Sequence, residues 1–459
     1  MSPVFMDSQY RTNQPTKLWN HNFLLLWLGQ MVSQIGQRAF GLAMLFFIKE
    51  KTGSASLMGL MVLFSTLPGI LLGPLGGTFA DNFPRKKIVV FGDLLNGLFV
   101  SSLAALMLFA VYVSHTIAAT SQPADFTLPM LQYFSLHSDR LQLTWLFIVA
   151  MAGAIIFAFF TPAVSASVPD LVPENKLDAA NSLNQFAIFI SLFVGQGLGG
   201  LLYAIMGAPI LFLINGFTYF FASSAEAFIT IPQSIPQVPK KGKEAFRVFI
   251  SDTMEGLHYV WNQKGMRMLF LAAALLALFI APMALLLPFY VEDYLKLDAS
   301  WYGYLLMSLG VGSVVGYGIA GAVNMRGRSQ GHLVIFSLVG AAIGLGVVGF
   351  ITIPIVVLCV VFIVGLLAGI FMVKATTILQ LAASSEIRGR VFGLLGTLTS
   401  GLAPLGMGIA GVIADLADKN IPAIYATCGV LVLILSIVIA CSKEARDFLM
   451  LDVSHRASE

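Results

Sequence analysis

The sequence has few charged residues and few cysteines for its length. Only 11% of its 459 residues are Asp, Glu, Lys or Arg, and the net charge is +3. A nucleic-acid partner, which needs a concentrated basic surface, is therefore not expected. The chain has three cysteines, an odd number that excludes full pairing into a disulfide framework.

Motifs of enzymes and of ATP-driven pumps are also missing. The chain has no G-x-x-x-x-G-K-[ST] phosphate-binding loop, no H-E-x-x-H metal motif and no G-x-S-x-G nucleophile elbow. Its six histidines are scattered, which argues against a metal site. We therefore predict no enzyme activity, no catalytic residues, no cofactor, no metal and no direct use of ATP.

Long apolar runs dominate what is present. Hydrophobic residues make up 58% of the chain and the mean hydropathy is +0.86, values typical of a polytopic membrane protein. A helix needs about 20 apolar residues to cross the hydrocarbon layer, so the sequence predicts an all-α protein with twelve transmembrane helices. The twelve runs cover residues 22–48, 56–79, 87–113, 143–166, 182–204, 208–231, 267–291, 301–323, 331–351, 354–380, 389–414 and 421–441.

Basic residues are distributed unequally among the segments that join these runs. With a cytoplasmic N-terminus, nineteen of the 26 Lys and Arg fall on the cytoplasmic side and five on the outer side, as the positive-inside rule requires. Both termini are therefore predicted to be cytoplasmic. Residues 114–142 would then form an outer loop.

A polar segment divides the chain between the sixth and seventh runs. Residues 232–266 begin with prolines and lysines and continue with the apolar spacing of an amphipathic helix on a membrane surface. Short glycine-rich phrases repeat weakly on either side of it. We therefore predict two six-helix bundles, residues 1–231 and 267–459, joined by a cytoplasmic linker, with a substrate site where the halves meet.

A polar stripe runs along the first predicted span. Gln30, Ser33, Gln34, Gln37 and Arg38 follow helical spacing and share one face. Hydrogen bonds between helices would explain the glutamines and the serine. An arginine near mid-membrane costs roughly 2.5–3.5 kcal/mol and is by default a functional candidate, so we predict that this stripe lines a substrate cavity.

Three further charged residues lie within predicted spans. Lys374 is followed by Thr377 and gives the second half its own cation, for which binding of cargo and snorkelling to the surface are both open. Asp93 and Glu226 are candidates for proton coupling, with ion pairs between packed helices as the alternative.

Glycines recur at every fourth residue in two of the runs. Gly69, Gly73 and Gly77 lie in one, and Gly312 and Gly316 in the other. Small residues at this spacing let helix backbones approach closely. We expect both sets to lie at helix contacts.

Residues 77–87, with the sequence GTFADNFPRKK, concentrate charge between two apolar runs. The initial glycine, the aspartate and the basic end resemble the loop signature of the major facilitator superfamily, although Asn82 and Pro84 depart from it. The resemblance implies a loop that gates the cytoplasmic side. Its matching residues are Gly77, Asp81, Arg85, Lys86 and Lys87.

Other phrases extend this resemblance over nearly the whole chain. They include residues 27–30 (WLGQ), 169–173 (PDLVP) and 388–392 (RGRVF), whose order resembles the macrolide-efflux-like branch of the superfamily, which also includes enterobactin-type siderophore exporters. The resemblance implies the major facilitator fold, alternating access, and export of a small molecule driven by an ion gradient, with H⁺ as the expected coupling ion. It also implies a monomer in the bacterial inner membrane, in contact with lipid.

The residues after Gly36 bear on the cargo. Similar proteins often carry an acidic residue there, whereas this chain has Gln37 and Arg38. Because an intramembrane arginine repels cations, we favour an anionic or zwitterionic amphipathic cargo, either siderophore-like or drug-like. Two other hypotheses stay open: a lysophospholipid transporter or flippase, and a non-transporting membrane partner or assembly protein.

Overall fold

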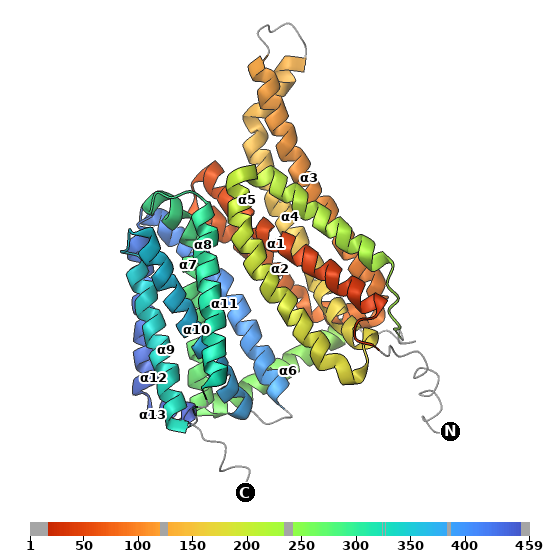
Figure 1. Cartoon of the computed structure of the whole chain (residues 1–459). Coiled ribbons are helices and arrows are strands. Elements are labelled where there is room, and N and C mark those ends of the chain that lie inside the picture. Colours follow the sequence, from red (N-terminus) through yellow and green to blue (C-terminus); the bar gives the residue numbers. More distant parts are fainter. Residues whose placement is uncertain are drawn as a thin grey trace, which may run out of the picture. The chain divides into compact units, whose positions relative to one another are not determined.

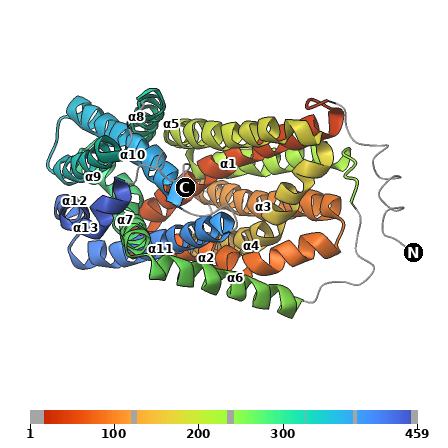
Figure 2. The same cartoon turned by 90° about the horizontal axis from the view of Figure 1, so that it is seen from below.

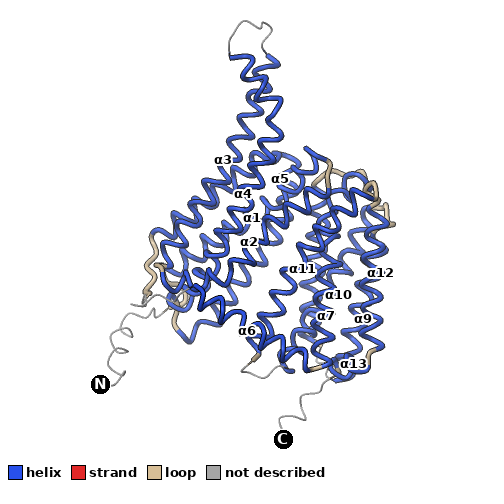
Figure 3. Tube along the Cα trace, turned by 180° about the vertical axis from the view of Figure 1, so that it is seen from behind, coloured by secondary structure: helices blue, strands red, loops and turns tan. Residues whose placement is uncertain are grey.

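The computed structural model consists of helices and the loops that join them. It describes residues 17–119, 127–233, 242–323, 325, 327–382 and 387–450. Within these ranges there is no β-strand (Figure 3). Eleven of the described helical segments are long and apolar enough to cross a membrane. The protein is an all-α, multi-pass membrane protein, as predicted.

The chain divides into two compact units. Unit 1 comprises residues 1–47 and 64–246, and unit 2 comprises residues 48–63 and 247–459. Two helices, α1 (His21–Thr52) and α2 (Ala55–Asn82), therefore contribute residues to both units. Nothing in the sequence predicts that residues 48–63 belong to unit 2.

Three long helices and one short helical turn lie entirely within the described part of unit 1. They are α3 (Arg85–Ala119), α4 (Thr127–Leu171), the short η3 (Glu174–Lys176) and α5 (Leu177–Ala227). α5 is interrupted at Gly207, whose φ of 71° is a left-handed conformation that favours glycine. This break separates the predicted runs 182–204 and 208–231. α3 packs against both α4 and α5 (Figure 2).

Unit 2 contains further membrane-spanning helices and other helical segments. Its elements are α6 (Gly242–Asn262, which begins in unit 1), α7 (Lys264–Phe289), η4 (Tyr290–Tyr294), α8 (Ser300–Ala322), α9 (Gly327–Val348), α10 (Pro354–Ala382), α11 (Arg388–Leu416), α12 (Ile421–Cys441) and α13 (Lys443–Leu449). α10 packs against α8 and α9, α12 against α9, and α11 against α7 (Figure 1).

The predicted outer loop at 114–142 is wrong for the part of it that the structure describes. α3 continues to Ala119 and α4 begins at Thr127, and the two helices extend together beyond the other helices of unit 1 (Figures 1 and 3). Polar side chains here fold back on their own helix, since Thr116 Oγ1 donates to the Tyr112 carbonyl at 2.9 Å. The polar residues at 114–142 suggested a loop, but the described part of this segment is helical.

Close glycine contacts occur in both units, but not at all the predicted positions. In unit 2, a Cβ on Gly312 or Gly316 would collide with backbone carbonyls of α10, which confirms that pair. In α2, Gly73 and Gly77 face open space and Gly69 makes an ordinary contact, whereas Gly76 meets the Ala158 carbonyl of α4. Gly69 and Gly76 are seven residues apart and both face α4. The prediction is therefore correct for Gly69, wrong for Gly73 and Gly77, and missed Gly76.

The linker contains the predicted amphipathic helix, which is α6. Its Val260 is buried in the core of unit 2 and its Trp261 is exposed. Glu255 of α6 also forms an ion pair with Arg390 of α11, and both of these side chains are exposed.

Candidate functional site

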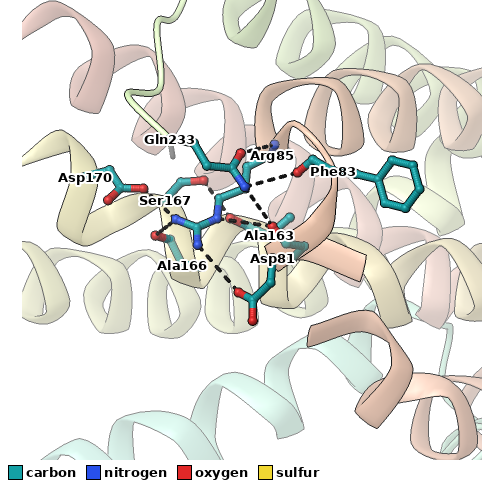
Figure 4. Close-up of polar contacts among 9 residues, drawn as sticks. Asp81, Phe83, Arg85, Ala163, Ala166, Ser167, Asp170 and Gln233 are labelled. Carbon is teal, nitrogen blue, oxygen red and sulfur yellow. Dashed lines mark hydrogen bonds and ion pairs between the residues drawn. The ribbon is translucent and has the colours of Figure 1, made fainter. Parts of the chain in front are cut away.

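A charged cluster forms where α2 ends and α3 begins (Figure 4). Arg85, the first residue of α3, forms an ion pair with Asp170 of α4, and its Nη2 lies 3.7 Å from Asp81 Oδ1. Its Nη1 also donates to the Ala166 carbonyl at 2.8 Å. Because the Arg85 side chain is only 15% exposed, these partners replace water around the guanidinium.

Gln233 completes this corner, although no sequence signal singled it out. Its Oε1 accepts the backbone N–H of Arg85 at 2.8 Å. Its Nε2 donates to the carbonyls of Ala80 and Phe83 at 3.1 and 3.2 Å. One amide thus pairs backbone groups on both sides of the corner, where helix ends leave them without intrahelical partners.

The cluster includes some, but not all, of the predicted gating residues. Asp81 and Arg85 lie together, and Gly77 is one turn earlier with open space where a Cβ would be. The side chains of Lys86 and Lys87 make no hydrogen bond or ion pair with the residues that the structure describes. Asp170 belongs to the sequence phrase at 169–173, which does not predict its pairing with Arg85.

The polar stripe of α1 separates into a buried part and an open part. Gln30 and Ser33 are buried. Gln30 Nε2 donates to Glu226 Oε1 of α5 at 2.8 Å, and Ser33 Oγ donates to the Gln30 carbonyl at 3.3 Å. These two side chains are therefore occupied inside unit 1 and do not contribute free polar groups to a cavity.

The open part consists of Gln34, Gln37 and Arg38. Gln34 and Gln37 are half-buried and Arg38 is exposed. None of the three side chains has a hydrogen-bond or ion-pair partner among the described residues. A polar group at membrane depth without a protein partner must meet water or a bound molecule, so these three residues are the strongest candidates for a cargo surface.

Asp93 and Glu226 form a buried carboxyl pair between α3 and α5. Their side chains are 2% and 0% exposed, and they interact with each other. Asp93 Oδ2 and Glu226 Oε2 are buried without a hydrogen-bond partner among the described atoms. The sequence placed each residue in a separate span, and the structure brings the two together.

The predicted site residues of α10, Lys374 and Thr377, have hydrogen-bond partners within unit 2. Lys374 is 8% exposed and donates from Nζ to the Val323 carbonyl at the C-terminal end of α8, at 3.0 Å. A cation at a helix C-terminus is electrostatically favourable. Thr377 Oγ1 donates to the Val373 carbonyl of its own helix at 2.8 Å.

Sequence reasoning missed a second polar cluster, within unit 2. Asp415 of α11 accepts hydrogen bonds from the Ala55 and Ser56 backbone N–H groups at 3.0 and 2.9 Å, and from Ser54 Oγ at 2.7 Å. It therefore caps the N-terminus of α2 from another helix.

Lys49 lies nearby in the sequence and is also bonded within unit 2. It pairs with Glu292 and Asp293 of η4 and donates to the Pro288 carbonyl at 3.0 Å. The sequence shows the lysine and the acidic residues of these two clusters near helix ends. It does not show that they pair across more than 200 positions.

Comparison with known proteins agrees with this helical architecture. The family model described as Major Facilitator Superfamily matches residues 26–407. The chain belongs to this superfamily. As a major facilitator protein it is a membrane transporter of small molecules and not an enzyme.

Characterised relatives of this major facilitator chain are efflux proteins. Macrolide efflux protein A of Streptococcus pyogenes is 26% identical over 434 residues, which cover 93% of this chain and 97% of that protein. The multidrug efflux pump Tap of Mycolicibacterium fortuitum is 25% identical over 413 residues, with 86% and 90% covered. The predicted resemblance to efflux transporters is confirmed.

Solved structures show the same fold at lower identity. A bacterial homologue of the iron transporter ferroportin in an inward-facing state aligns with a TM-score of 0.63 and 16% identity, covering 93% of this chain and all of that one. A D-xylose–proton symporter aligns with a TM-score of 0.61 and 15% identity, covering 91% and 96%.

Proposed function

We propose that this transporter exports a small amphipathic molecule, with anionic or zwitterionic cargo favoured, by alternating access driven by the proton gradient. The expected setting is a bacterial inner membrane, with both termini in the cytoplasm and a monomer as the working unit. Siderophore-like and drug-like organic molecules are the cargo classes to test. The efflux activity named for its relatives supports the direction of transport.

The open part of the α1 stripe carries this proposal. Arg38 is exposed and has no anionic partner among the described residues, and Gln34 and Gln37 lie on the same face of α1. A guanidinium binds carboxylate or phosphate through two parallel hydrogen bonds. The flanking amides can both donate and accept, which suits an amphipathic cargo with a polar head.

Lys374 has a smaller place in this proposal. Its ammonium is already bonded to the end of α8, so it would contribute to an anionic site through charge rather than through a direct contact. Thr377 has an internal acceptor as well. Arg38 is therefore the residue by which the proposed cargo preference is tested.

The proposed conformational cycle uses the Asp81–Arg85 corner as its cytoplasmic latch. Arg85 and Asp170 hold the corner together, and the side chains of Lys86 and Lys87 have no hydrogen-bond or ion-pair partner among the described residues. These two lysines are thus available to contact other groups, including lipid phosphates, during the cycle.

The test is transport by purified protein in liposomes with a set of anionic, zwitterionic and cationic cargoes of similar size. Arg38→Gln is expected to reduce transport of anionic cargo about tenfold or more, because it removes a charged hydrogen-bond donor worth roughly 1.5–3 kcal/mol. Cationic cargo should lose nothing. Arg38→Lys keeps the charge and should retain part of the preference.

Two results would contradict the proposed cargo. If wild type and Arg38→Gln handle anionic cargo equally, Arg38 does not face it. If lysophospholipid alone binds and moves, the protein is a lipid transporter. A well-folded protein that moves no cargo under any ion gradient would instead indicate a membrane partner or assembly protein.

A further inference from the structure

Asp93 and Glu226, the buried carboxyl pair of unit 1, lack enough hydrogen-bond donors for their oxygens. Asp93 and Glu226 each have one oxygen, Oδ2 and Oε2 respectively, that is buried and lacks a donor among the described groups. No Lys, Arg or His in the described chain forms an ion pair with either of them. Two ionised carboxylates would therefore leave two unpaired charges in an apolar interior, which is strongly unfavourable.

A single proton removes this deficit. With one carboxyl protonated, its O–H donates to the unpartnered oxygen of the other, and one hydrogen bond satisfies both atoms. A second proton is not needed to satisfy either unpartnered oxygen, because each protonated carboxyl still has a carbonyl oxygen that accepts. One proton is therefore the smallest number that satisfies both oxygens.

The surroundings of the pair are unequal, and the difference determines which residue carries the proton. Glu226 Oε1 already accepts a hydrogen bond from Gln30 Nε2 at 2.8 Å. A donor of this kind stabilises an ionised acceptor. Asp93 has no side-chain donor of this kind among the described residues. Asp93 is therefore the protonated member and Glu226 the acceptor.

Gln30 connects the pair to the proposed cargo face. It lies on α1, the helix that carries Gln34 and Arg38, and two turns separate Gln30 from Arg38. The backbones of α1 and α5 are in direct contact beside it, because a Cβ on Gly29 would lie 3.3 Å from Ala222 Cα. A change at Glu226 is thereby transmitted to α1 through a short contact.

We propose that Asp93 and Glu226 hold one proton between them, and that Gln30 is the positioning residue through which its loss acts on α1. The sharing of the proton follows from the contacts of the pair alone, whereas the use of this proton in transport rests on the proposed proton-driven export. Loss of the proton leaves two adjacent carboxylates competing for the one amide donor of Gln30. The resulting repulsion shifts α1 relative to α3 and α5.

Among the described residues, another titratable group near the pair is Tyr219 of α5, whose phenol interacts with Asp93. It lies 8% exposed on the same helix as Glu226. α1 contributes the uncharged Gln30. On α4, the side chains nearest to the Cβ position of Gly92 are Ile156 and Phe160, which are apolar. A sodium ion is a second possible occupant of two carboxylates, and the test separates it from a proton.

The first measurement is infrared spectroscopy of the full-length protein in nanodiscs, at the C=O stretch of protonated carboxyl groups. Wild type should show one such band near neutral pH, unchanged by sodium. Asp93→Asn and Glu226→Gln should each remove the whole band, because each supplies an amide donor that lets the remaining carboxylate stay ionised. The exposed Asp447→Asn is the control and should leave the band intact.

The band gives three results that would overturn the pair. Two independent acids would lose half the band in each variant. Two ionised carboxylates would show no band in wild type. A sodium site would lose its band when sodium is added. None of these readings requires a known cargo, so failure of the proposed export leaves this test valid.

The second measurement concerns Gln30, which Met can replace in volume but not in hydrogen bonding. Gln30→Met should lower the ratio of pH-driven transport to cargo exchange about tenfold, the effect of losing one hydrogen bond to a charged group. The control is Gln330→Met, which removes another buried glutamine, in α9. An unchanged ratio in Gln30→Met would refute the positioning role.

The two measurements together separate the inference from the function on which it rests. A one-proton band with no pH-driven flux would leave the pair in place and refute proton-driven export. Proton-driven flux that survives in Asp93→Asn and Glu226→Gln would support the proposed function and refute the use of the shared proton in transport.

Discussion

The two ends of α2 contact different charges. At the N-terminal end, the backbone N–H of Ala55 donates to the Asp415 carboxylate of α11. At the C-terminal end, which is Asn82, the neighbouring Asp81 pairs with the Arg85 guanidinium of α3. The first contact pairs a negative charge with the positive end of a helix dipole. The second contains Asp81 at a helix C-terminus and Arg85 at a helix N-terminus, each at the unfavourable end of its own helix. The comparison shows one cluster that is favourable locally and another that depends on its charges compensating each other.

The largest expected effect comes from removing the cation of the second cluster. Arg85→Ala leaves Asp170 half-buried without its partner and leaves Asp81 beside a helix C-terminus, so we expect a loss of about 2–4 kcal/mol in stability and a severe loss of transport. Thermal unfolding in detergent and liposome flux measure the two effects.

Lys87→Ala is the matched control for this change. The Lys87 side chain is exposed and has no hydrogen-bond or ion-pair partner among the described residues, so the effect of its removal on stability should stay within about 0.5 kcal/mol. If both variants lose stability equally, the cluster does not depend on the Arg85 contacts.

The next effect tests packing near the same end of α2. Gly76→Ala would force a Cβ against the Ala158 carbonyl of α4, and overpacking of this kind costs about 1–3 kcal/mol. Gly73→Ala is the control, because nothing lies within 4 Å of its Cβ position. Equal unfolding temperatures for the two variants would mean that α2 and α4 can separate without cost.

The smallest effect is expected at the N-terminal end of α2. Asp415→Ala removes a helix cap, which costs about 0.5–2 kcal/mol. Asp415→Asn keeps an acceptor oxygen but loses the charge, so it should cost only about 0.3–1 kcal/mol. Thermal unfolding of both variants, compared with Arg85→Ala, would show whether stability depends less on the Asp415 cluster than on the Arg85 cluster. A larger loss for Asp415→Ala than for Arg85→Ala would reverse the comparison.

The sequence predicted the helices of both ends well because apolar length is a local property. It identified Asp81 and Arg85 through a short phrase, but their partners Asp170 and Gln233 lie 85 and 148 positions from Arg85. Nothing in the local pattern distinguishes these partners from other polar residues near helix ends. Asp415 was missed for the same reason, since its acceptor role depends on α2, 359 to 361 positions away.

The α1 stripe shows the same limit within a single helix. Periodicity placed Gln30, Ser33 and Arg38 on one face, but only the packing of α5 and α3 determines which of them are occupied. Gln30 was predicted to line a cavity and instead bonds to Glu226. Asp93 and Glu226 were both identified as carboxylates in the membrane, and their proximity required the tertiary structure.

The paired extension of α3 and α4 has a practical consequence for imaging. Both helices are continuous with the membrane-spanning part of unit 1, to Ala119 and from Thr127. A rigid helical protein fused in phase with these two ends would project from unit 1 as an asymmetric marker. Particles of a 49.4 kDa protein could then be aligned by electron cryomicroscopy, with the fused mass reporting the direction of unit 1 in each image.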